Sequence, residues 1–442
     1  MVRGAAFGLF TFASICAAGP ARADGDGGAT MPGTLAVHAQ STFTEMGALP
    51  FPSPYRGTDS LPSGAGRETF DATVFIGARP WNGAEVWIDP ELDQGFAPGN
   101  TEGVAAFVSG EGFKIGRANP YVRIHRWMLR QSVDLGGALQ TVDPGQNELG
   151  GTQTSDRIVF TIGRLSVTDV FDANRYAHDP RNDFLNWAVI DTGTFDYAAD
   201  AWGFTYGASA ELYDGHWTIR AGVFDLSISP NDVRLDPAFG QFQLIGEVEQ
   251  RYAMGKRAGK LAITVFLTRG RMAKFTDAIA EAEASGTVPE VADVRDYRSR
   301  TGVSANLEQA ITDDVGFFAR AGMANGSIEP FEYTDIDKTA TVGVSITGTR
   351  WRRADDTVGI AGVIDGVSKV HQRYLALGGL GILVGDGKLP HPGPEEILET
   401  YYDLAIVKHL ALTFDGQIVG NPAYNRDRGP APVLGVRLHA QF

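Results

Sequence analysis

Apolar and polar residues alternate with a period of two along much of this chain, which is the pattern of β-strands with two unlike faces. Between residues 261 and 268, Leu261 and Ile263 share one face while Ala262 and Thr264 share the other. The same alternation runs through residues 202–212, 217–223 and 340–347, and less regularly around residues 70–81, 84–89, 158–162, 303–307 and 315–323. Residues 278–284 are an exception and predict a two-turn helix that packs within a loop. We therefore expect an all-β fold.

Two all-β architectures produce this alternation: a soluble sandwich with its apolar faces inside, and a transmembrane barrel with its apolar face toward lipid. Three features favour the barrel. Many polar faces combine Gly, Ser and Thr with isolated charges, as a wet lumen permits. Large aromatic residues stand at strand ends, where an interfacial girdle would place Trp81, Trp202 and Trp217. Charged clusters are expected in loops between strands, at residues 89–93, 179–183 and 350–356.

The last residues form the clearest single strand. One face carries Leu434, Val436, Leu438, Ala440 and Phe442, and the other carries polar residues such as Arg437 and His439. A final amphipathic strand that ends in Phe is the form in which bacterial outer-membrane barrels present themselves for assembly, so we expect the barrel assembly machinery as a partner. An ordinary edge strand that ends in Phe is the alternative. A closed sheet supplies every strand with a hydrogen-bonding neighbour, which lipid requires.

The N-terminal region has the composition of a secretory signal peptide. Arg3 precedes a short apolar core, and an Ala-Arg-Ala sequence ending at Ala23 supplies the small-x-small pattern before cleavage. The one cysteine, Cys16, lies in this segment, so we expect no disulfide in the mature chain. The next residues are rich in Gly, Pro, Ser and Thr, which favours an extended arm. The predicted domains are the signal peptide at 1–23, the N-terminal arm at 24–66 and the transmembrane barrel at 67–442.

Composition narrows the function classes. The chain has 442 residues, of which 43% are hydrophobic, and this is enough to build an ordered structure. It has 38 basic and 53 acidic residues, a formal charge of −15, and this acidic balance argues against nucleic-acid binding. No apolar run reaches the roughly 20 residues of a membrane helix, so we do not expect a helical membrane protein.

Three long stretches have a distinctive sequence: TDVFDANRYAHDPRNDFLNWAVIDTGTFDYAADAWG at 168–203, VRDYRSRTGVSANLEQAITDDVGFFARA at 294–321, and a C-terminal region that runs from RYLALGGLGILVGDGKLPHPGPEEILETYYD through NPAYNRDRGP to LHAQF. They resemble the carbohydrate-selective porins of Gram-negative outer membranes, the OprB type. Shorter pieces such as WIDPELDQG, SGEGFK and RQSVDLGG match as well. The resemblance implies a 16-stranded antiparallel β-barrel in the outer membrane that lets sugars diffuse through a narrowed pore.

A neutral sugar offers hydroxyl groups for hydrogen bonds and a C–H face that lies well on an aromatic ring. Its pore should therefore combine both charge signs with aromatic rings. The acidic segment 169–196 is expected to fold into the channel, where it should disfavour anionic solutes. Strand parity directs several arginines to the same lumen. The candidate constriction residues are Asp169, Asp172, Arg175, Asp179, Asp183, Trp187, Arg220, Arg320 and Arg437.

For each of these residues there is a structural alternative. The arginines could be wall residues paired with neighbouring strands, and the acidic segment could be a capping loop held by its own Asx turns. The chain has no Gly-x-Ser-x-Gly elbow, no H-E-x-x-H motif and no phosphate-binding loop, so we expect no catalytic residue, no metal site and no cofactor. A barrel hydrolase, a soluble carbohydrate-binding sandwich and a non-conducting anchor are the alternatives to a porin. Carbohydrate solutes and outer-membrane lipid are the expected partners, with the barrel either a monomer or a homotrimer.

Overall fold

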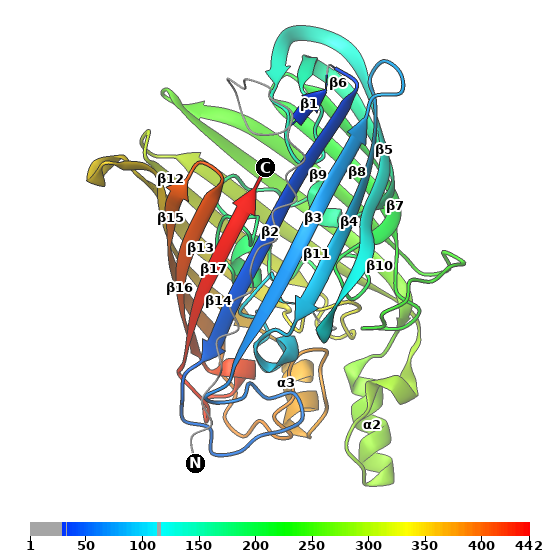
Figure 1. Ribbon diagram of the computed structural model, residues 1–442. Coiled ribbons are helices and arrows are strands. Elements are labelled where there is room, and N and C mark those ends of the chain that lie inside the picture. The colour runs from blue at the N-terminus through cyan, green and yellow to red at the C-terminus, as the bar shows by residue number, and fades with distance from the viewer. Residues whose placement is uncertain (1–28, 32, 113–115) are drawn as a thin grey trace.

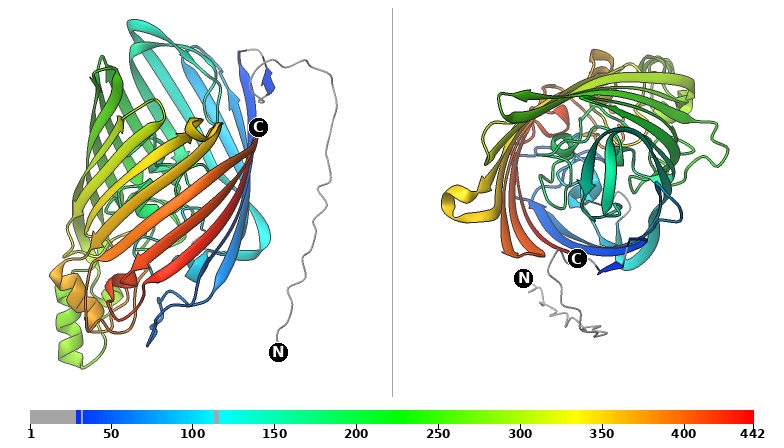
Figure 2. Two further views of the ribbon diagram at one scale, coloured as in Figure 1. Left: turned by 90° about the vertical axis from the view of Figure 1, so that its left-hand side faces the viewer. Right: turned by 90° about the horizontal axis from the view of Figure 1, so that it is seen from above.

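The computed structural model describes residues 29–31, 33–112 and 116–442 of the chain (Figure 1). Within these residues, sixteen antiparallel strands, β2 to β17, form one closed sheet. Each strand pairs with its neighbours along the chain, and the last strand pairs with the first. A short additional strand, β1, pairs with the start of β2. Figure 2 shows the strands tilted around a common axis. The predicted antiparallel barrel of sixteen strands is confirmed.

The strands are β1 (Ala29–Met31), β2 (Leu35–Ala48), β3 (Gly66–Ala78), β4 (Ala84–Gly95), β5 (Arg117–Val142), β6 (Gly151–Leu165), β7 (Thr205–Asp214), β8 (Trp217–Asp225), β9 (Phe242–Met254), β10 (Arg257–Met272), β11 (Asp296–Ala310), β12 (Val315–Ala324), β13 (Lys338–Gly348), β14 (Arg353–Gly366), β15 (Glu395–Val407), β16 (Leu410–Gly420) and β17 (Ala431–Gln441). The helices are α1 (Trp187–Ile190), α2 (Phe275–Ser285) and α3 (Lys369–Ala376). Single 3-10 turns lie at Pro98–Thr101, Val167–Asp169, Val291–Val294, Thr349–Trp351 and Pro422–Tyr424.

The connections between strands differ at the two ends of the barrel. At one end, named the turn end here, they are short and comprise residues 79–83, 143–150, 215–216, 255–256, 311–314, 349–352 and 408–409. At the other end, the loop end, they are long and comprise residues 49–65, 96–116, 166–204, 226–241, 273–295, 325–337, 367–394 and 421–430. Outer-membrane barrels have short periplasmic turns and longer extracellular loops. The two ends of this barrel show the same difference in connection length.

The two faces of each strand differ in chemistry, as β10 shows. Ile263 and Val265 point outward and are 41% and 51% exposed, whereas Ala262, Thr264 and Phe266 point inward and are at most 3% exposed. An apolar outward face suits contact with lipid. The inward side chains are buried because segments of the chain fill part of the lumen.

The final strand follows the predicted pattern. Leu434, Val436 and Leu438 of β17 point outward and are exposed, while Arg437 and His439 point inward and are buried. The polar residues of this strand therefore belong to the lumen wall.

The prediction of an extended arm over residues 24–66 is wrong for the central part of this range. Leu35–Ala48 forms β2, which pairs with β17 on one side and with β3 on the other, and so closes the barrel. Its outward face carries Leu35, Val37 and Phe43, and apart from Met46 the rest of the strand consists of small and polar residues. This mixed composition concealed the alternation. The predicted signal peptide lies outside the described residues.

The charged cluster at residues 89–93 lies within β4 and not in a loop, contrary to expectation. Asp89, Glu91 and Asp93 point into the lumen and are buried, and they alternate with outward residues such as Ile88. Carboxylates are tolerated in a membrane strand where they face the lumen and have hydrogen-bonding or cationic partners. Charge alone therefore does not mark a loop in this fold.

The predicted helix at residues 278–284 is confirmed and extends over the eleven residues of α2. It lies at the loop end, below the ring of strands in Figure 1. The ring of Phe275 stacks on His371 of α3 with the ring centroids 4.2 Å apart. The helix is therefore a packing element among the loops. Of the helices in the described part of the chain, none has the length and apolar character needed to span a membrane.

Replacing Ile263 with Arg should lower the free energy of unfolding by about 2–4 kcal/mol, because it puts a charge on the lipid-facing side near the middle of a strand. The matched control is Ile311→Arg, the same change in a short turn where the side chain is 52% exposed. It should cost at most about 1 kcal/mol. Denaturant unfolding in lipid vesicles measures both values. Equal losses for the two variants would contradict the lipid-facing assignment.

Candidate functional site

Residues 166–204 join β6 to β7 and are named the inward loop here, because they fold into the barrel (Figure 2). The loop begins with a capping box, in which the Ser166 amide donates to Asp169 Oδ2 at 3.0 Å. Further along, Asn186 caps α1, and its side-chain oxygen accepts a hydrogen bond from Ala188 N at 3.1 Å. These local turns make the loop compact enough to fit inside the ring of strands.

A buried arginine of β12 holds the inward loop by its carbonyl groups. Arg320 donates to the carbonyls of Ala177, Val189 and Ile190 at 2.8, 2.6 and 2.8 Å. Its guanidinium also lies 3.6 Å from the carboxylate of Asp172. A buried carbonyl without a partner is costly, so these donors stabilise one position of the loop.

Residues of β17 and β15 hold the next part of the same loop. Arg437 donates to the carbonyl of Asp183 at 2.9 Å and also to that of Pro180. The carboxylate of Glu399 accepts from the amide of Leu185 at 2.6 Å. Charged side chains of the wall therefore serve as hydrogen-bonding partners for loop backbone.

Aromatic packing completes the attachment on this side of the lumen. Phe184 meets Phe318 and Tyr401 edge-on, with ring centroids 5.5 and 4.8 Å apart. Phe195 lies against Phe266 at 5.5 Å. The wall partners come from β10, β12 and β15. The inward loop thus packs against β10, β12 and β15, and it also contacts β8 through Phe224 and β9 through Glu247.

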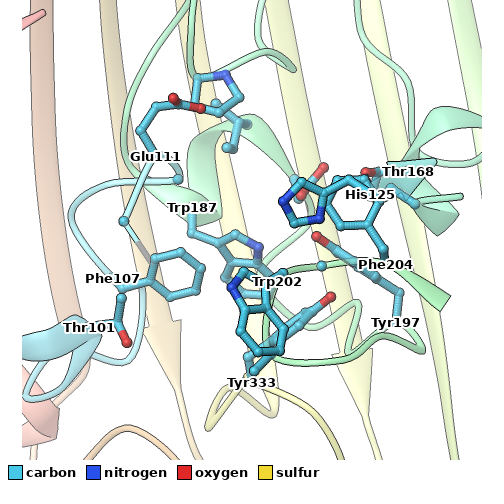
Figure 3. Close-up of a pocket in the computed structure, with 18 of the residues that line it drawn as sticks. Thr101, Phe107, Glu111, His125, Thr168, Trp187, Tyr197, Trp202, Phe204 and Tyr333 are labelled. Carbon is cyan, nitrogen blue, oxygen red and sulfur yellow. The ribbon is translucent and has the colours of Figure 1, made fainter. Parts of the chain in front are cut away.

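Two cavities remain on the opposite side, along β2 to β5. The first, of about 210 Å³, lies between the inward loop and residues 101–112 (Figure 3). The second, of about 340 Å³, lies between the inward loop and the turn at residues 143–150. Five residues line both cavities: Arg126, Thr168, His178, Pro180 and Arg181. The cavities are therefore adjacent along the lumen, the first toward the loop end and the second toward the turn end.

A β-bulge brings two consecutive residues, His125 and Arg126, to the lumen. The register between β4 and β5 shifts so that Asp89 pairs with Arg126 while the next residue, Pro90, pairs with Ile124. Proline has no amide hydrogen for the ladder and is tolerated at bulges, which re-aim side chains. We did not single out His125 or Arg126 from the sequence. A proline inside a strand pattern was the available signal.

Two guanidinium groups stand between the cavities, and carboxylates fix each of them. Arg126 makes two hydrogen bonds to Asp169, of 2.7 and 2.8 Å. Arg181 lies 3.2 to 3.4 Å from three carboxylates, those of Asp71, Glu91 and Glu111. A guanidinium has five N–H donors. Arginines held in this way can offer their remaining donors to a solute.

Aromatic rings line the first cavity, namely Phe107, Trp187, Tyr197, Trp202, Phe204 and Tyr333 (Figure 3). Trp187 stacks on Phe107 with centroids 5.3 Å apart. The guanidinium carbon of Arg123 lies 3.6 Å from the ring centroid of Trp202, whose indole N–H donates to Tyr121 at 2.9 Å. The expectation that Trp202 belongs to a membrane girdle is therefore wrong. The residue precedes β7 and lies inside the barrel.

Three of the nine predicted constriction residues line the cavities. Trp187 lines the first cavity, and Asp169 and Asp179 line the second. Arg181, which belongs to the acidic segment 169–196 that was expected to enter the channel, lines both cavities. Arg126, which was not named from the sequence, lines both as well.

The other six predicted residues lie away from the two cavities. Four of them hold the inward loop in place: Asp172, Asp183, Arg320 and Arg437. Arg175 is exposed on the loop, where its amide donates to Glu308 at 2.7 Å. Arg220 belongs to the wall, where it pairs with the carboxylates of Glu211, Glu247 and Glu249. Strand parity gave the correct, lumenal face for Arg220, Arg320 and Arg437. The inward loop occupies the lumen next to these residues, so they do not line the cavities.

Asp191 gives the first cavity a group that titrates near neutral pH. Burial, with the nearby carboxylate of Asp172, raises the pKa of Asp191 to about 8, although Arg320 opposes this shift. His178 Nδ1 lies 3.8 Å from Asp191 Oδ1, and burial and Arg320 lower the pKa of this histidine. Both groups are therefore mainly neutral at pH 7.

A closed antiparallel barrel with long loops at one end, and with one of them folded into the lumen beside a polar pathway, is an outer-membrane porin. A family model described as the carbohydrate-selective porin, OprB family, matches residues 59–442. The chain belongs to this family, and family and fold indicate a channel.

Individual relatives are more distant. Porin AaxA of Chlamydia abortus (strain DSM 27085 / S26/3) is 22% identical over 303 residues, which make up 66% of this chain and 56% of that protein. The chain thus spans about half the length of this relative. The high-pH structure of Pseudomonas putida OprB aligns with a TM-score of 0.69 and 13% identity, covering 92% of this chain and 94% of that one. The outer-membrane channel DcaP of Acinetobacter baumannii aligns with a TM-score of 0.51 and 10% identity, covering 94% and 99%. These structural likenesses show the fold.

Raising the pH from 7 to 9 should make the channel more cation-selective, because Asp191 loses its proton and adds a negative charge to the first cavity. Reversal potentials across planar bilayers under a salt gradient measure this change. Asp191→Asn should abolish it and leave the selectivity at pH 7 nearly unchanged, because the amide resembles the protonated acid.

The matched control is Asp59→Asn. Burial raises the pKa of Asp59 to about 7, but this residue lies in the loop at residues 49–65 and lines neither cavity. This variant should keep the pH-dependent change in selectivity. If Asp191→Asn shows the same pH-dependent change in selectivity as the parent channel, the change does not come from the titration of Asp191.

Proposed function

We propose that neutral mono- and disaccharides diffuse through this channel by way of the two cavities between the inward loop and strands β2 to β5. The observation that carries the proposal is the balance of charge around the first cavity. With Asp191 protonated, the carboxylates of Glu91 and Glu111 stand against the guanidinium groups of Arg126 and Arg181. The hydroxyl groups of a sugar both donate and accept hydrogen bonds. A cavity with equal numbers of carboxylates and guanidinium groups can therefore bind them from either side.

The second cavity has the same balance. Its charged lining consists of three acidic side chains, Glu148, Asp169 and Asp179, and three arginines, Arg126, Arg130 and Arg181. We include Asp169, Asp179 and Trp187 of the predicted constriction among the proposed solute contacts. Four of the remaining six predicted residues, Asp172, Asp183, Arg320 and Arg437, act through the position of the inward loop.

The aromatic lining supports a sugar over other small polar solutes. A pyranose ring has a C–H face, and an aromatic side chain gives it a large apolar surface at low entropic cost. Phe107 and Trp187 form one such surface, and Phe204, which stacks on His125, forms another (Figure 3). Because aromatic rings lie beside fixed guanidinium groups, a sugar can form a new stacking contact or hydrogen bond as it leaves the previous one.

Liposome swelling with the purified protein tests the proposal. Glucose and a neutral disaccharide should enter, and gluconate should enter more slowly than glucose at low ionic strength, because the chain carries a net charge of −15. Salt should reduce this difference by screening. Entry of gluconate as fast as glucose at low salt would contradict the proposal, as would no entry of either sugar.

Replacing Trp202 with Ala should weaken sugar binding in the channel by about 2- to 10-fold, the equivalent of roughly 0.5–1.5 kcal/mol for one aromatic contact. The half-saturating sugar concentration for block of the ion current in planar bilayers measures this effect. The matched control is Trp81→Ala, at a 54% exposed tryptophan in the turn at residues 79–83. An unchanged half-saturation in the Trp202 variant would place the sugar pathway elsewhere.

We also propose that β17 is the strand by which the barrel assembly machinery recognises this protein. Phe442 is 59% exposed, and its backbone pairs with Ala39 through hydrogen bonds of 2.8 and 2.9 Å where the barrel closes. Phe442→Asp should therefore reduce the amount of folded barrel in the outer membrane while the sugar flux per folded channel stays the same. A folded outer-membrane barrel migrates differently on a denaturing gel before and after boiling. The intensity of the unheated band therefore measures the amount of folded protein. Normal amounts of the folded variant would refute this role.

A further inference from the structure

Glu91 and Asp93 of β4 and His125 of β5 form a compact cluster on the wall of the first cavity. The three residues are 4%, 0% and 1% exposed. His125 Nε2 lies 3.2 Å from Asp93 Oδ2 and 3.5 Å from Glu91 Oε1. One donor atom from each residue lies within 4.8 Å of the other two.

This cluster contains more buried carboxyl groups than cationic partners. Four buried carboxylates meet here, those of Asp71, Glu91, Asp93 and Glu111. Among the described residues, the cationic partners in ion pairs with them are Arg181 and, when protonated, His125. Buried carboxylates are normally paired with cations or bound to metal ions. The excess of carboxyl groups over cationic partners therefore favours an additional cation.

An unused carboxylate oxygen points to the same conclusion. Within the described part of the chain, Asp93 Oδ1 is buried and accepts no hydrogen bond. The other carboxylate oxygen of the fully buried Asp93 faces His125. A buried polar atom without a partner costs free energy, so its retention in the cluster needs a reason.

The geometry matches a tetrahedral metal site. With bonds of about 2.0–2.2 Å to nitrogen and oxygen, two ligands of a tetrahedral Zn²⁺ lie about 3.3–3.5 Å apart. The separations of 3.2 and 3.5 Å from His125 Nε2 are close to these values. One imidazole with two carboxylates suits Zn²⁺, whereas Ca²⁺ and Mg²⁺ prefer oxygen ligands alone.

We propose that Glu91, Asp93 and His125 form a binding site for Zn²⁺ on the wall of the channel. Glu91 and His125 line the first cavity, so the fourth coordination position is open to water or a solute. The hydroxyl of Thr73 donates to Glu91, and the ring of Phe204 stacks on His125 with centroids 4.5 Å apart. These contacts fix the orientation of two ligands before the metal binds.

The bulge at Pro90 is what assembles the site. It turns His125 toward the lumen in addition to Arg126, opposite the two carboxylates of β4. The three ligands come from two strands, which is why no metal-binding motif stands out in the sequence. A bound Zn²⁺ adds two positive charges beside Arg126 and Arg181, so it should lower the cation selectivity of the channel.

Titration calorimetry with ZnCl₂ on the purified barrel in detergent tests the proposal. We expect one Zn²⁺ per barrel, and affinity at least about tenfold weaker in His125→Gln and in Asp93→Asn, since even residues that only support metal ligands change affinity by 10–100-fold. The matched control is His38→Gln, a lumenal histidine of β2 that is 8% exposed. Its affinity for Zn²⁺ should equal that of the parent protein. Reversal potentials with and without Zn²⁺ should change in the parent and not in His125→Gln.

Two results would overturn the site: no binding of Zn²⁺ by the parent protein, or equal affinity in His125→Gln and the parent. If the variants do not show the heat-dependent gel mobility of a folded barrel, crystals of the parent protein grown with ZnCl₂ test whether the metal binds at these residues. An anomalous-scattering peak between β4 and β5 at these residues is expected, and a peak only elsewhere would contradict the proposal. Zinc binding is measured without any sugar, so it succeeds or fails separately from sugar transport.

Discussion

A loop inside a barrel needs a partner for each of its backbone N–H and C=O groups, and this requirement governs the lumen of the protein. The partners are charged side chains of the wall. Arg320 and Arg437 donate to loop carbonyls, and Glu399 accepts from a loop amide. The two arginines are at most 2% exposed. Residues that would line an open pore therefore serve here to hold the inward loop in one position.

Arg320, Arg437 and Glu399 hold the inward loop from one side of the barrel. The pathway that we propose lies on the other side, where ion pairs such as Arg126–Asp169 also reach the loop. The space that remains there lies along β2 to β5. On these strands the bulge at Pro90 directs His125 and Arg126 into the lumen, and carboxylates of β3, β4 and residues 96–116 fix Arg181. The narrow region between the cavities thus contains fixed charges of both signs beside aromatic rings.

Much of the fold could be predicted from the sequence, because period-two alternation directly reflects a sheet between lipid and lumen. β10, β17 and the loop helix α2 were found in this way. β2 was missed because its small and polar residues resemble an arm, and Asp89–Asp93 were misplaced because a polar lumen admits carboxylates in mid-strand. Parity gave the correct face for Arg320. It could not show that a loop more than a hundred residues away in sequence covers this residue. In the sequence, Pro90 was the one signal of the β-bulge that directs His125 and Arg126 into the lumen.

We propose that solutes pass between the inward loop and β2 to β5, and not on the other side of the loop. Single cysteines test it most directly, since the one native cysteine lies in the predicted signal peptide. Thr168 lines both cavities, whereas Thr341 is 1% exposed behind the loop, where its hydroxyl donates to the Ala188 carbonyl at 2.8 Å. A bulky thiol reagent should block ion current and sugar entry in Thr168→Cys and leave Thr341→Cys conducting. Block of Thr341→Cys with full conduction in Thr168→Cys would contradict this pathway.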